Sequence, residues 1–548
     1  MSNAPMHQEP PSPEPPFPEP LYLEPRLESA LESLLKETAF LQGLVAALGS
    51  PLHILLPEQI ASNAERFRDV FRRHQLTGRI FFAHKANRSS ALVRRLAATG
   101  ERVGAGLDVA SLGELRHGLG AGFAGERVVA TGPKSPEFLW LAARSGVTVN
   151  ADGVQEVEEA ARLVRAYGLP RVRLLLRLSE FQTPASGTRT LSRRSRFGTP
   201  VKALDTLLDA VERHRDALEP IGVGYHLDTT GLDEKATALE GCLRAMEELR
   251  IRGFTPRAVD VGGGFGTGYL AHAGQWDRYT SALTDAVMGG RPPLTWGGHG
   301  YGLRVENGTL KGSLALYPAY RSVAGPGYLD ALLSRPAPCL GRPLGTLLLE
   351  SMYELFAEPG RALADQCGLS LATVLEVRRA EAGEHLVRLA MNAGDVSLED
   401  HGVLMDPVLL PQQDGRGHGR GEGPVGVHLM GNLCLESDLI TRRRVCLPRL
   451  PRQGDLLAFA NTAGYCMDFG ATHAQQQPLA RRVAVWQEER GTGGWRWMLD
   501  EEYWPVTRTR TDTGTDAGTG TDAGTGTDAG TGTDAGTGTG TPTGGPYA

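Results

Sequence analysis

A lysine at the end of an apolar run is the first residue that could carry chemistry. Lys85 stands in the run Phe-Phe-Ala-His-Lys-Ala-Asn at residues 81–87. An ammonium beside a buried strand is costly unless its amine is used, and a desolvated lysine becomes nucleophilic enough to form a Schiff base with a carbonyl cofactor. Taken alone, Lys85 is more typical of a lysine whose stem packs on the strand while its head reaches water.

Two further segments could bind an anion. The glycine triplet 262–264 follows an apolar run, and three glycines let backbone N–H groups approach an anion closely. In Glu-Pro-Gly-Arg at 358–361, Arg361 could grip a phosphate with its guanidinium fork, and Glu358 could hold a proton on a heteroaromatic nitrogen. The alternatives are an ordinary glycine loop and an exposed turn with a weak surface ion pair.

A histidine and a threonine after another apolar run could contact the same cofactor. His226 can stack on a planar ring, and Thr229 can donate to a phosphate. On its own, a histidine in this place is more often a core residue with a satisfied hydrogen bond.

Together and in this order, the segments resemble a known family. Phe-Ala-His-Lys-Ala-Asn at 82–87 is similar to the Tyr-Ala-x-Lys-Ala-Asn motif of the pyridoxal-phosphate (PLP) decarboxylases with an alanine-racemase-like barrel. That group includes diaminopimelate, ornithine and arginine decarboxylases, and the resemblance spans roughly residues 50–487. The other matching segments are 104–115, 132–135, 195–198, the glycine triplet, Glu-Pro-Gly-Arg, 434–438, 454–456 and 463–465.

The resemblance implies a cofactor site assembled from many parts of the chain. Lys85 would form the internal aldimine with PLP, Glu358 would pair with the pyridine nitrogen, and His226 would stack on the ring. Asp108 and Arg177 would line the cofactor pocket. The residues implied to hold the rest of the cofactor, chiefly its phosphate, are Thr229, Gly262, Gly263, Gly264, Gly360, Arg361 and Tyr465.

The resemblance also implies an activity and an assembly. Breaking the Cα–carboxylate bond leaves two electrons that the protonated pyridine ring accepts as a quinonoid, and a carboxylate such as Glu358 keeps that proton in place. Alanine racemases on the same barrel have an arginine there, so we expect a PLP-dependent carboxy-lyase. Cys434 would come from the partner subunit and protonate the quinonoid carbon, in a homodimer with shared active sites. The alternatives are a racemase-like or other PLP lyase acting on an atypical amino acid and a non-catalytic PLP-binding homologue.

The sequence departs from the family at the substrate end of the site. Relatives that act on basic side chains have an acid directly after the equivalent of Cys434, but here Leu435 follows it and Glu436 comes one later. A shift of one residue in an extended segment turns the side chain to the other face. Either the loop is re-registered and Glu436 faces the substrate, or the distal pocket is apolar. Asp438 and His473 complete the expected substrate-binding set.

The order of apolar segments predicts the fold that must position these residues. Apolar runs alternate with helix-like stretches over residues 57–370, and at least six such units favour an α/β fold with a closed (β/α)8 TIM-type barrel. Functional residues of such a barrel lie at the C-terminal ends of its strands. The expected strands are 80–83, 128–130, 147–150, 172–178, 221–226 and 258–261, with 347–350 as a possible further strand. The expected helices include 89–99, 155–167, 203–214 and 234–252.

The other segments predict a second domain and two disordered ends. Residues 371–508 are expected to form a C-terminal, mostly-β domain, which 26–56 joins with an N-terminal helix and a strand. A segment at about 267–346, rich in Gly, Pro and aromatics, is expected to be an insertion in the PLP-binding barrel. The Pro-rich arm 1–25 and the Thr/Gly/Asp/Ala repeat tail 509–548 have little to bury and are expected to be disordered.

Composition excludes several other classes of protein. A hydrophobic share of 41% suits a globular enzyme, and a net charge of −6 indicates no basic surface for nucleic acid. The six cysteines show no CxxC pairing, which argues against a disulfide framework or a metal site. The N-terminus does not resemble a signal peptide, and no apolar run is long enough to span a bilayer. Together with the resemblance, this composition leads us to expect a cytoplasmic enzyme acting on an amino acid as its small-molecule substrate, without a membrane or nucleic-acid partner.

Overall fold

The computed structural model describes residues 20–181, 195–227, 229–381, 383–412, 423–467, 469–487 and 494–505 of the chain. The repeat tail and most of the Pro-rich arm lie outside these ranges. The last part of the arm is ordered, contrary to the expected disorder up to residue 25. Leu23 is buried, and its N–H donates to the carboxylate of Asp406 at 2.6 Å.

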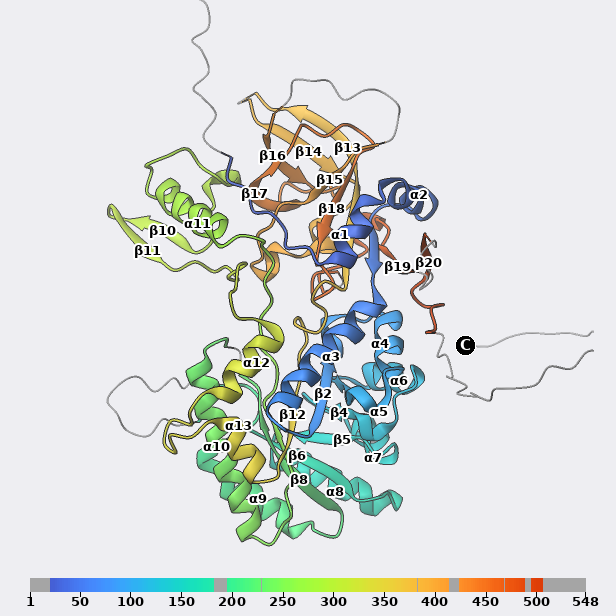
Figure 1. The fold of residues 1–548 in the computed structure, drawn as a ribbon, viewed down its shortest axis with the longest axis vertical. Helices are drawn as coiled ribbons and strands as arrows, with labels where there is room; N and C mark the ends of the chain where they lie inside the picture. Colours follow the sequence, from blue (N-terminus) through green and yellow to red (C-terminus); the bar gives the residue numbers. More distant parts are fainter. Residues whose placement is uncertain are drawn as a thin grey trace, which may run out of the picture. The chain divides into compact units, whose positions relative to one another are not determined.

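Eight parallel strands close into a barrel, which confirms the predicted fold class (Figure 1). Each barrel strand pairs with the next along the chain, and the last pairs with the first. The barrel strands are β2 (Gly78–Ala83), β3 (Ala105–Val109), β4 (Val128–Ala130), β5 (Thr148–Ala151), β6 (Val172–Ser179), β8 (Leu218–Tyr225), β9 (Ala258–Asp260) and β12 (Glu354–Ala357). A two-residue strand, β7 (Thr199–Pro200), pairs with the end of β6.

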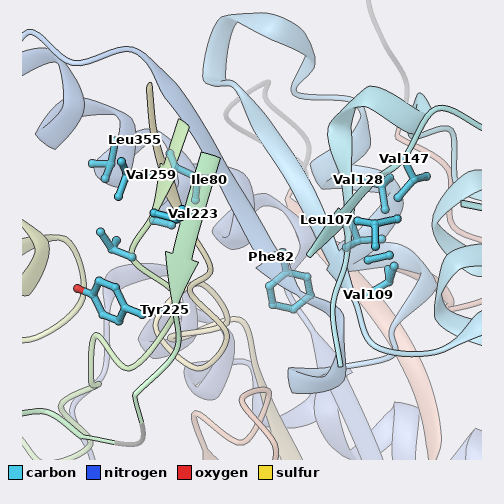
Figure 2. Close-up of a cluster of buried hydrophobic side chains, with 14 of the residues drawn as sticks. Ile80, Phe82, Leu107, Val109, Val128, Val147, Val223, Tyr225, Val259 and Leu355 are labelled. Atoms are coloured by element: carbon cyan, nitrogen blue, oxygen red, sulfur yellow. The ribbon is translucent and has the colours of Figure 1, made fainter. Parts of the chain in front are cut away.

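Alternate side chains of the barrel strands pack in two layers. Ile80 and Phe82 of β2 belong to the large core cluster shared with the helices, whereas Phe81 between them belongs to a cluster inside the barrel. Figure 2 shows part of the large cluster, with side chains contributed by successive barrel strands. The inner cluster consists of Phe81, Val129, Leu175, Ile221, Ala258 and Phe356. This alternation follows from the two-residue period of a strand.

Helices surround the barrel, and serine caps start three of them (Figure 1). Ser89, Ser111 and Ser135 each accept a hydrogen bond from the backbone N–H three residues later. The helices are α3 (Pro57–Arg73), α4 (Ser90–Ala97), α5 (Gly100–Val103), α6 (Leu112–Gly120), α7 (Pro136–Arg144), α8 (Val154–Tyr167), α9 (Leu204–Arg213), α10 (Leu232–Ile251), α12 (Gly325–Ser334) and α13 (Leu344–Glu350). Short 3-10 turns are η1 (His84–Ala86), η2 (Gly125–Arg127) and η3 (Val201–Ala203).

The segment 347–350 is helical, and its prediction as a strand is wrong. It forms the end of α13, and the eighth barrel strand is β12 instead. A short leucine run fits a buried helix or a buried strand equally well. Here the run continues a helix that begins directly after Pro343, and leucine has a high helix propensity. Because β12 ends directly before Glu358, the quartet 358–361 opens at the C-terminal end of a barrel strand.

A second sheet is formed by one strand that precedes the barrel in the chain and by strands that follow it. Its strand β1 (Leu52–Leu55) pairs with β13 in antiparallel and with β19 in parallel. The order is β17-β16-β14-β13-β1-β19-β20, and β18 pairs with both β13 and β15. The other strands are β13 (Gly368–Arg379), β14 (His385–Leu389), β15 (Val408–Leu410), β16 (Val425–Met430), β17 (Leu439–Leu447), β18 (Leu456–Ala460), β19 (Arg481–Gln487) and β20 (Trp495–Leu499). The 3-10 turns of this part are η5 (Ala393–Val396), η6 (Glu399–His401) and η7 (Ala474–Gln476).

Two helices precede β1 where the sequence predicts one. α1 (Ser29–Lys36) and α2 (Thr38–Leu48) are separated by Glu37, whose ψ of 57° is not helical. Leu34 and Leu41, one from each helix, are buried in the core of the second sheet.

The segment predicted as an insertion divides between the two cores. Tyr269 and Tyr279 are buried in the core of the second sheet, whereas α12 and α13 pack in the barrel core. The inserted part is therefore residues 267–324, and the helices after it belong to the barrel. The elements of this insertion are α11 (Ala273–Val287), η4 (Trp296–Gly298), β10 (Leu303–Glu306) and β11 (Thr309–Gly312).

The part of the chain that the structure describes contains neither a candidate membrane span nor a candidate metal cluster. No helix there combines the length and the apolar composition that a bilayer span requires. In the same ranges, no group of three or more His, Cys, Asp or Glu side chains could hold a metal ion.

Candidate active site

A cavity of about 590 Å³ lies at the C-terminal ends of β2, β8, β9 and β12. Functional residues of such barrels gather at this end. Tyr465, from the second sheet's part of the chain, also lines the cavity. The insertion contributes Leu316, Tyr317, Pro318 and Arg321. The site therefore combines the barrel, the second domain and the insertion.

Lys85 lies on η1, directly after β2, and its side chain lines the cavity. Burial lowers the pKa of its amine, but the nearby Asp108, Tyr465 and Glu358 raise that pKa by more, so the net shift is upward. Lys85 is therefore an ammonium at neutral pH in the unliganded chain. A Schiff base at this position requires the amine to give up that proton first.

Glu358 is buried with one oxygen paired and the other free. Its Oε2 lies 3.3 Å from His226 Nδ1, while Oε1 has no hydrogen-bond partner among the described residues. Burial raises the pKa of the carboxyl, but His226 and Lys85 lower it by more, so its pKa is below the ordinary value. Desolvation lowers the pKa of His226. An ionised, buried carboxylate with a free oxygen suits a protonated ring nitrogen.

Two more buried carboxyl groups interact with Glu358. Asp108, in β3, stands opposite Ala83 in the parallel ladder, and Asp260 is the last residue of β9. Burial and then the charge of Glu358 raise the pKa of both aspartates well above the ordinary value. Among the three groups, the directions of these pKa shifts favour negative charge on Glu358.

The three-glycine loop follows β9, but only part of it can bind an anion. Gly262 donates its N–H to Asp260 Oδ1 at 2.8 Å and does not line the cavity, so it cannot serve as the predicted phosphate ligand. The N–H of Gly263 points at His226 Nδ1, 3.4 Å away. In this loop, the N–H groups of Gly264, Phe265 and Gly266 have no partner among the described residues, and all three residues line the cavity.

Arg361 lines the cavity among three tyrosines. Its Nη1 donates to Tyr269 Oη at 2.6 Å, and its guanidinium carbon lies 5.1 Å from the ring centre of Tyr317 and 5.3 Å from that of Tyr465. Burial lowers the pKa of Arg361, but Tyr269 and other neighbours raise it by more, so the group stays charged. A Cβ at Gly360 would lie 2.5 Å from Tyr465 Oη, so the tyrosine can take its place only beside a glycine.

Two threonines after β8 add hydroxyl groups to the same cavity. Thr229 Oγ1 accepts the N–H of Gly231 at 3.0 Å, which leaves its O–H free to donate. Thr230 Oγ1 accepts from Arg321 Nη2 at 3.4 Å. The cavity is thus rich in cations and donors around Arg361 and acidic around Glu358.

Arg177 and His473 are among the predicted residues that lie outside the cavity lining. Arg177 is buried, with Nη1 3.3 Å from Asp152 Oδ1 and its guanidinium carbon 5.0 Å from the ring centre of Phe197. His473 is exposed, and its Nδ1 lies 3.3 Å from the carbonyl oxygen of Gln477.

The predicted substrate loop between β16 and β17 also lies apart from the cavity of its own chain. Its exposed residues include Cys434, Leu435 and Glu436. Asp438 is buried, and its two oxygens accept the N–H groups of Ala393 at 2.9 Å and Leu433 at 2.8 Å. Its carboxylate therefore holds the loop.

Sequence reasoning missed four residues of this site. Asp260 could have been found, because it is a carboxylate in an apolar run, two residues before the glycine triplet. Lys235 is fully buried, its Nζ donates to the Gly263 carbonyl, and burial lowers its pKa to about 8. No pattern in the sequence separates Lys235 from the other charged residues of α10. Tyr317 and Arg321 lie in a segment without helical or strand periodicity, so nothing local predicts them.

Comparison with known proteins places the chain in a family. The family described as "Pyridoxal-dependent decarboxylase, pyridoxal binding domain" matches residues 58–308. The chain is 29% identical to an uncharacterized Sinorhizobium fredii protein, y4yA, over 85% of this chain and 94% of that protein. It is 32% identical to the diaminopimelate decarboxylase of Deinococcus radiodurans over 42% of this chain and 59% of that enzyme. It is 29% identical to the ornithine decarboxylase of Schizosaccharomyces pombe over 36% of this chain and 44% of that enzyme, so these two matches span about half of each enzyme.

Solved structures share the fold at lower identity. A diaminopimelate decarboxylase from M. jannaschii superposes with a TM-score of 0.63 at 19% identity, covering 84% of this chain and 91% of that one. A Vibrio vulnificus lysine/ornithine decarboxylase, complexed with putrescine, has a TM-score of 0.57 at 19% identity, covering 84% and 99%.

PLP, the cofactor of this family, suits the groups that the cavity offers. The free oxygen of Glu358 can accept a ring N–H, and the unpartnered N–H groups after Gly263 together with Arg361 can bind a phosphate. Loops after the seventh and eighth strands often form the phosphate site in such barrels, and these groups follow β9 and β12. On this geometry and these matches, residues 58–308 match the pyridoxal-binding domain of the PLP-dependent decarboxylases, and the chain is a divergent relative of that family.

Proposed function

We propose that this chain releases CO2 from an amino acid with the help of PLP. The observation that carries the proposal is Glu358, whose buried carboxylate has a lowered pKa and a free oxygen. Bound PLP supplies an electron sink for the bond that breaks, and a carboxylate at its ring nitrogen strengthens that sink. The similarity to diaminopimelate and ornithine decarboxylases supports the same activity.

The residues of the chain have distinct tasks in this proposal. Lys85 would hold the cofactor through the cofactor's aldehyde carbon. Glu358 keeps a proton on the ring nitrogen, and His226 orients Glu358 through the 3.3 Å contact. Arg361 and the free N–H groups of the glycine loop hold the phosphate. Because Asp108 and Asp260 retain protons, they leave Glu358 as the negative group of the cluster.

A homodimer with shared active sites is part of the proposal. Cys434 does not line the cavity of its own chain, so we infer that it reaches the cavity of a partner and protonates Cα there. Leu435 is 54% exposed and Phe469 is 63% exposed, which is unusual for large apolar side chains unless another surface covers them. The ring of Phe469 lies 5.8 Å from that of Tyr465, so this exposed surface adjoins the cavity.

The substrate class depends on the exposed loop. With Asp438 occupied by backbone N–H groups, Glu436 is the acid in this loop that remains for a distal ammonium, and Leu435 would instead suit an apolar side chain. We also infer a cytoplasmic location, because the six cysteines are all free thiols.

Carbon dioxide release from a panel of basic, acidic and apolar amino acids tests the proposed function. We expect PLP-dependent release from at least one amino acid, together with formation of the corresponding amine. Inversion of the substrate without CO2 would identify a racemase-like enzyme and overturn the proposal. A chain that binds PLP and changes none of the amino acids would be a non-catalytic homologue.

A further inference from the structure

Arg321, from the insertion, lines the same cavity as Arg361 and has no carboxylate partner among the described residues. Its Nη2 reaches Thr230 Oγ1 at 3.4 Å, and its Nε is buried without a hydrogen bond. The side chain as a whole is half-buried, but an N–H that is buried without an acceptor is costly, because it has lost water and gained no partner. Arg321 therefore has a donor available for an anionic ligand.

The neighbours of Arg321 place it beside the donors expected to bind the phosphate. A Cβ built on Gly266 would lie 3.2 Å from Arg321 Cδ and 3.4 Å from its Nε, so the arginine packs directly on the glycine loop. Gly266 is one of the residues whose N–H groups are free there. Thr230, the other contact, follows Thr229. Arg321 therefore lies beside the groups expected to bind the phosphate. No carboxylate of the described residues forms an ion pair with it.

The insertion is tied down at this place. Tyr317 Oη accepts the N–H of Thr267 at 2.7 Å and donates to the carbonyl of the same residue at 3.2 Å. The N–H of Tyr317 donates to the Gly402 carbonyl at 2.9 Å. The ring of Tyr317 lies against both guanidinium groups, 4.7 Å from Arg321 and 5.1 Å from Arg361. The two cations are thus held on one aromatic ring.

We propose that Arg321 is a second guanidinium ligand of the cofactor's phosphate, supplied by the insertion. A phosphate monoester carries up to two negative charges and three acceptor oxygens, whereas Arg361 spends one of its donors on Tyr269. A second arginine supplies the missing charge and donors. This inference rests on PLP as the cofactor and is independent of whether the enzyme releases CO2.

Equilibrium binding of PLP and of pyridoxal, which lacks the phosphate, tests the proposal. Each is titrated into cofactor-free wild-type protein and into the Arg321→Met variant, and the absorbance of the Lys85 adduct reports binding. Loss of one charge-assisted hydrogen bond should weaken PLP binding about tenfold or more. Pyridoxal binding should stay within about twofold, because it makes no use of the phosphate donors. Arg304→Met, which alters an exposed insertion arginine paired with Glu306, is the control and should change neither.

The other outcomes are distinct. Equal weakening of PLP and pyridoxal in Arg321→Met would mean a general disturbance of the cavity and would overturn the phosphate assignment. Unchanged PLP binding with a raised KM for an acidic amino acid would assign Arg321 to the substrate instead. If wild-type protein bound no PLP at all, the cofactor assignment would fail before this inference was reached. A 31P NMR signal of bound PLP that shifts in Arg321→Met but not in Arg304→Met would support the direct contact independently.

Discussion

At the scale of single residues, the placement of one negative charge among three buried carboxyl groups sets the chemistry. Asp108 and Asp260 have raised pKa values, and Glu358 has a lowered one, because the contact with His226 lowers the pKa of Glu358, whereas burial and the charge of Glu358 outweigh the other effects on the aspartates. An acid that stays ionised in a buried site can keep a partner N–H protonated. The site thus selects which of three similar groups carries the charge.

Replacing Glu358 by alanine tests that charge. Glu358→Ala should still bind PLP through Lys85, since the phosphate donors remain, but its rate of CO2 release should fall by about 100-fold or more, as when a preorganised charge is removed from an active site. Absorbance measures cofactor binding, and CO2 capture measures turnover. Glu350→Ala, at an exposed ion pair with Arg342, is the matched control and should leave turnover unchanged. Near-normal turnover in Glu358→Ala would rule out its proposed role.

A buried lysine behind the glycine loop gives a second prediction. Lys235 Nζ donates to the Gly263 carbonyl, and in a trans peptide the next N–H points the opposite way, so Lys235 orients the N–H of Gly264. Its pKa of about 8 in the folded chain lies below the ordinary 10.5. The unfolded chain therefore binds more protons between these two values, and wild-type stability should rise as the pH rises from 8 to 10.5.

The Lys235→Met variant should lose this pH dependence. At pH 7 it should be more stable than wild type by roughly 1–3 kcal/mol, because a buried charge is gone, while its PLP binding should weaken. Urea unfolding at pH 7 and pH 9.5 gives the first quantity, and PLP titration gives the second. Lys202→Met, at an exposed lysine, should change neither. Equal pH slopes for wild type and Lys235→Met would contradict the assignment of this lysine.

At the scale of elements, the strands of the barrel could be predicted but the insertion could not. Runs such as 80–83 are apolar on both faces, as strands between a barrel interior and a helix layer must be, and this pattern is local. The segment 347–350 was wrongly predicted as a possible strand, because four residues are too few to distinguish a strand from a helical turn. Arg321 is positioned by tertiary contacts of an irregular segment, and the role proposed for Cys434 depends on a second subunit that a single chain does not contain. Single-sequence patterns carry neither kind of information.

A buried ion pair ties three elements of the second domain together. Asp406 accepts from Arg443 Nη1 at 2.6 Å in β17 and from the N–H of Leu23 at 2.6 Å. The guanidinium carbon of Arg443 lies 5.2 Å from the ring centre of Tyr279 in the insertion. Removing one partner of such a pair leaves an uncompensated buried charge.

Asp406→Ala should therefore lower the free energy of unfolding by about 3–5 kcal/mol. It should also speed proteolytic cleavage near residue 23, since the backbone anchor of Leu23 is lost. Urea unfolding and timed proteolysis measure the two effects. The double variant Asp406→Ala/Arg443→Met should recover part of the lost stability, because the unpaired cation is gone. A double variant less stable than Asp406→Ala would contradict this explanation.

At the scale of the whole molecule, the proposed dimer predicts that two inactive variants restore each other. In a mixture of Lys85→Ala and Cys434→Ala chains, one site of each heterodimer has an intact Lys85 and receives an intact Cys434. After unfolding and refolding together, about a quarter of all sites should be active, because half of the random dimers are heterodimers with one whole site. CO2 release measures the recovery. Lys85→Ala mixed with Glu358→Ala is the control, since both residues act in their own chain's cavity and no site becomes whole. Absence of recovery in the first mixture would exclude shared sites.

The position of β1 has a consequence for how the chain is made. This strand is synthesised before the barrel, yet it pairs Leu52 with Leu371 on one edge and with Arg481 on the other. Both hydrogen-bonding edges of β1 therefore stay unpaired while the ribosome translates several hundred further residues. Unpaired strand edges promote aggregation. Nascent chains stalled before residue 481 should need a chaperone to stay in solution, which sedimentation of stalled ribosome complexes can measure. The enzyme's yield in a cell would then depend on its last strands as much as on its catalytic barrel.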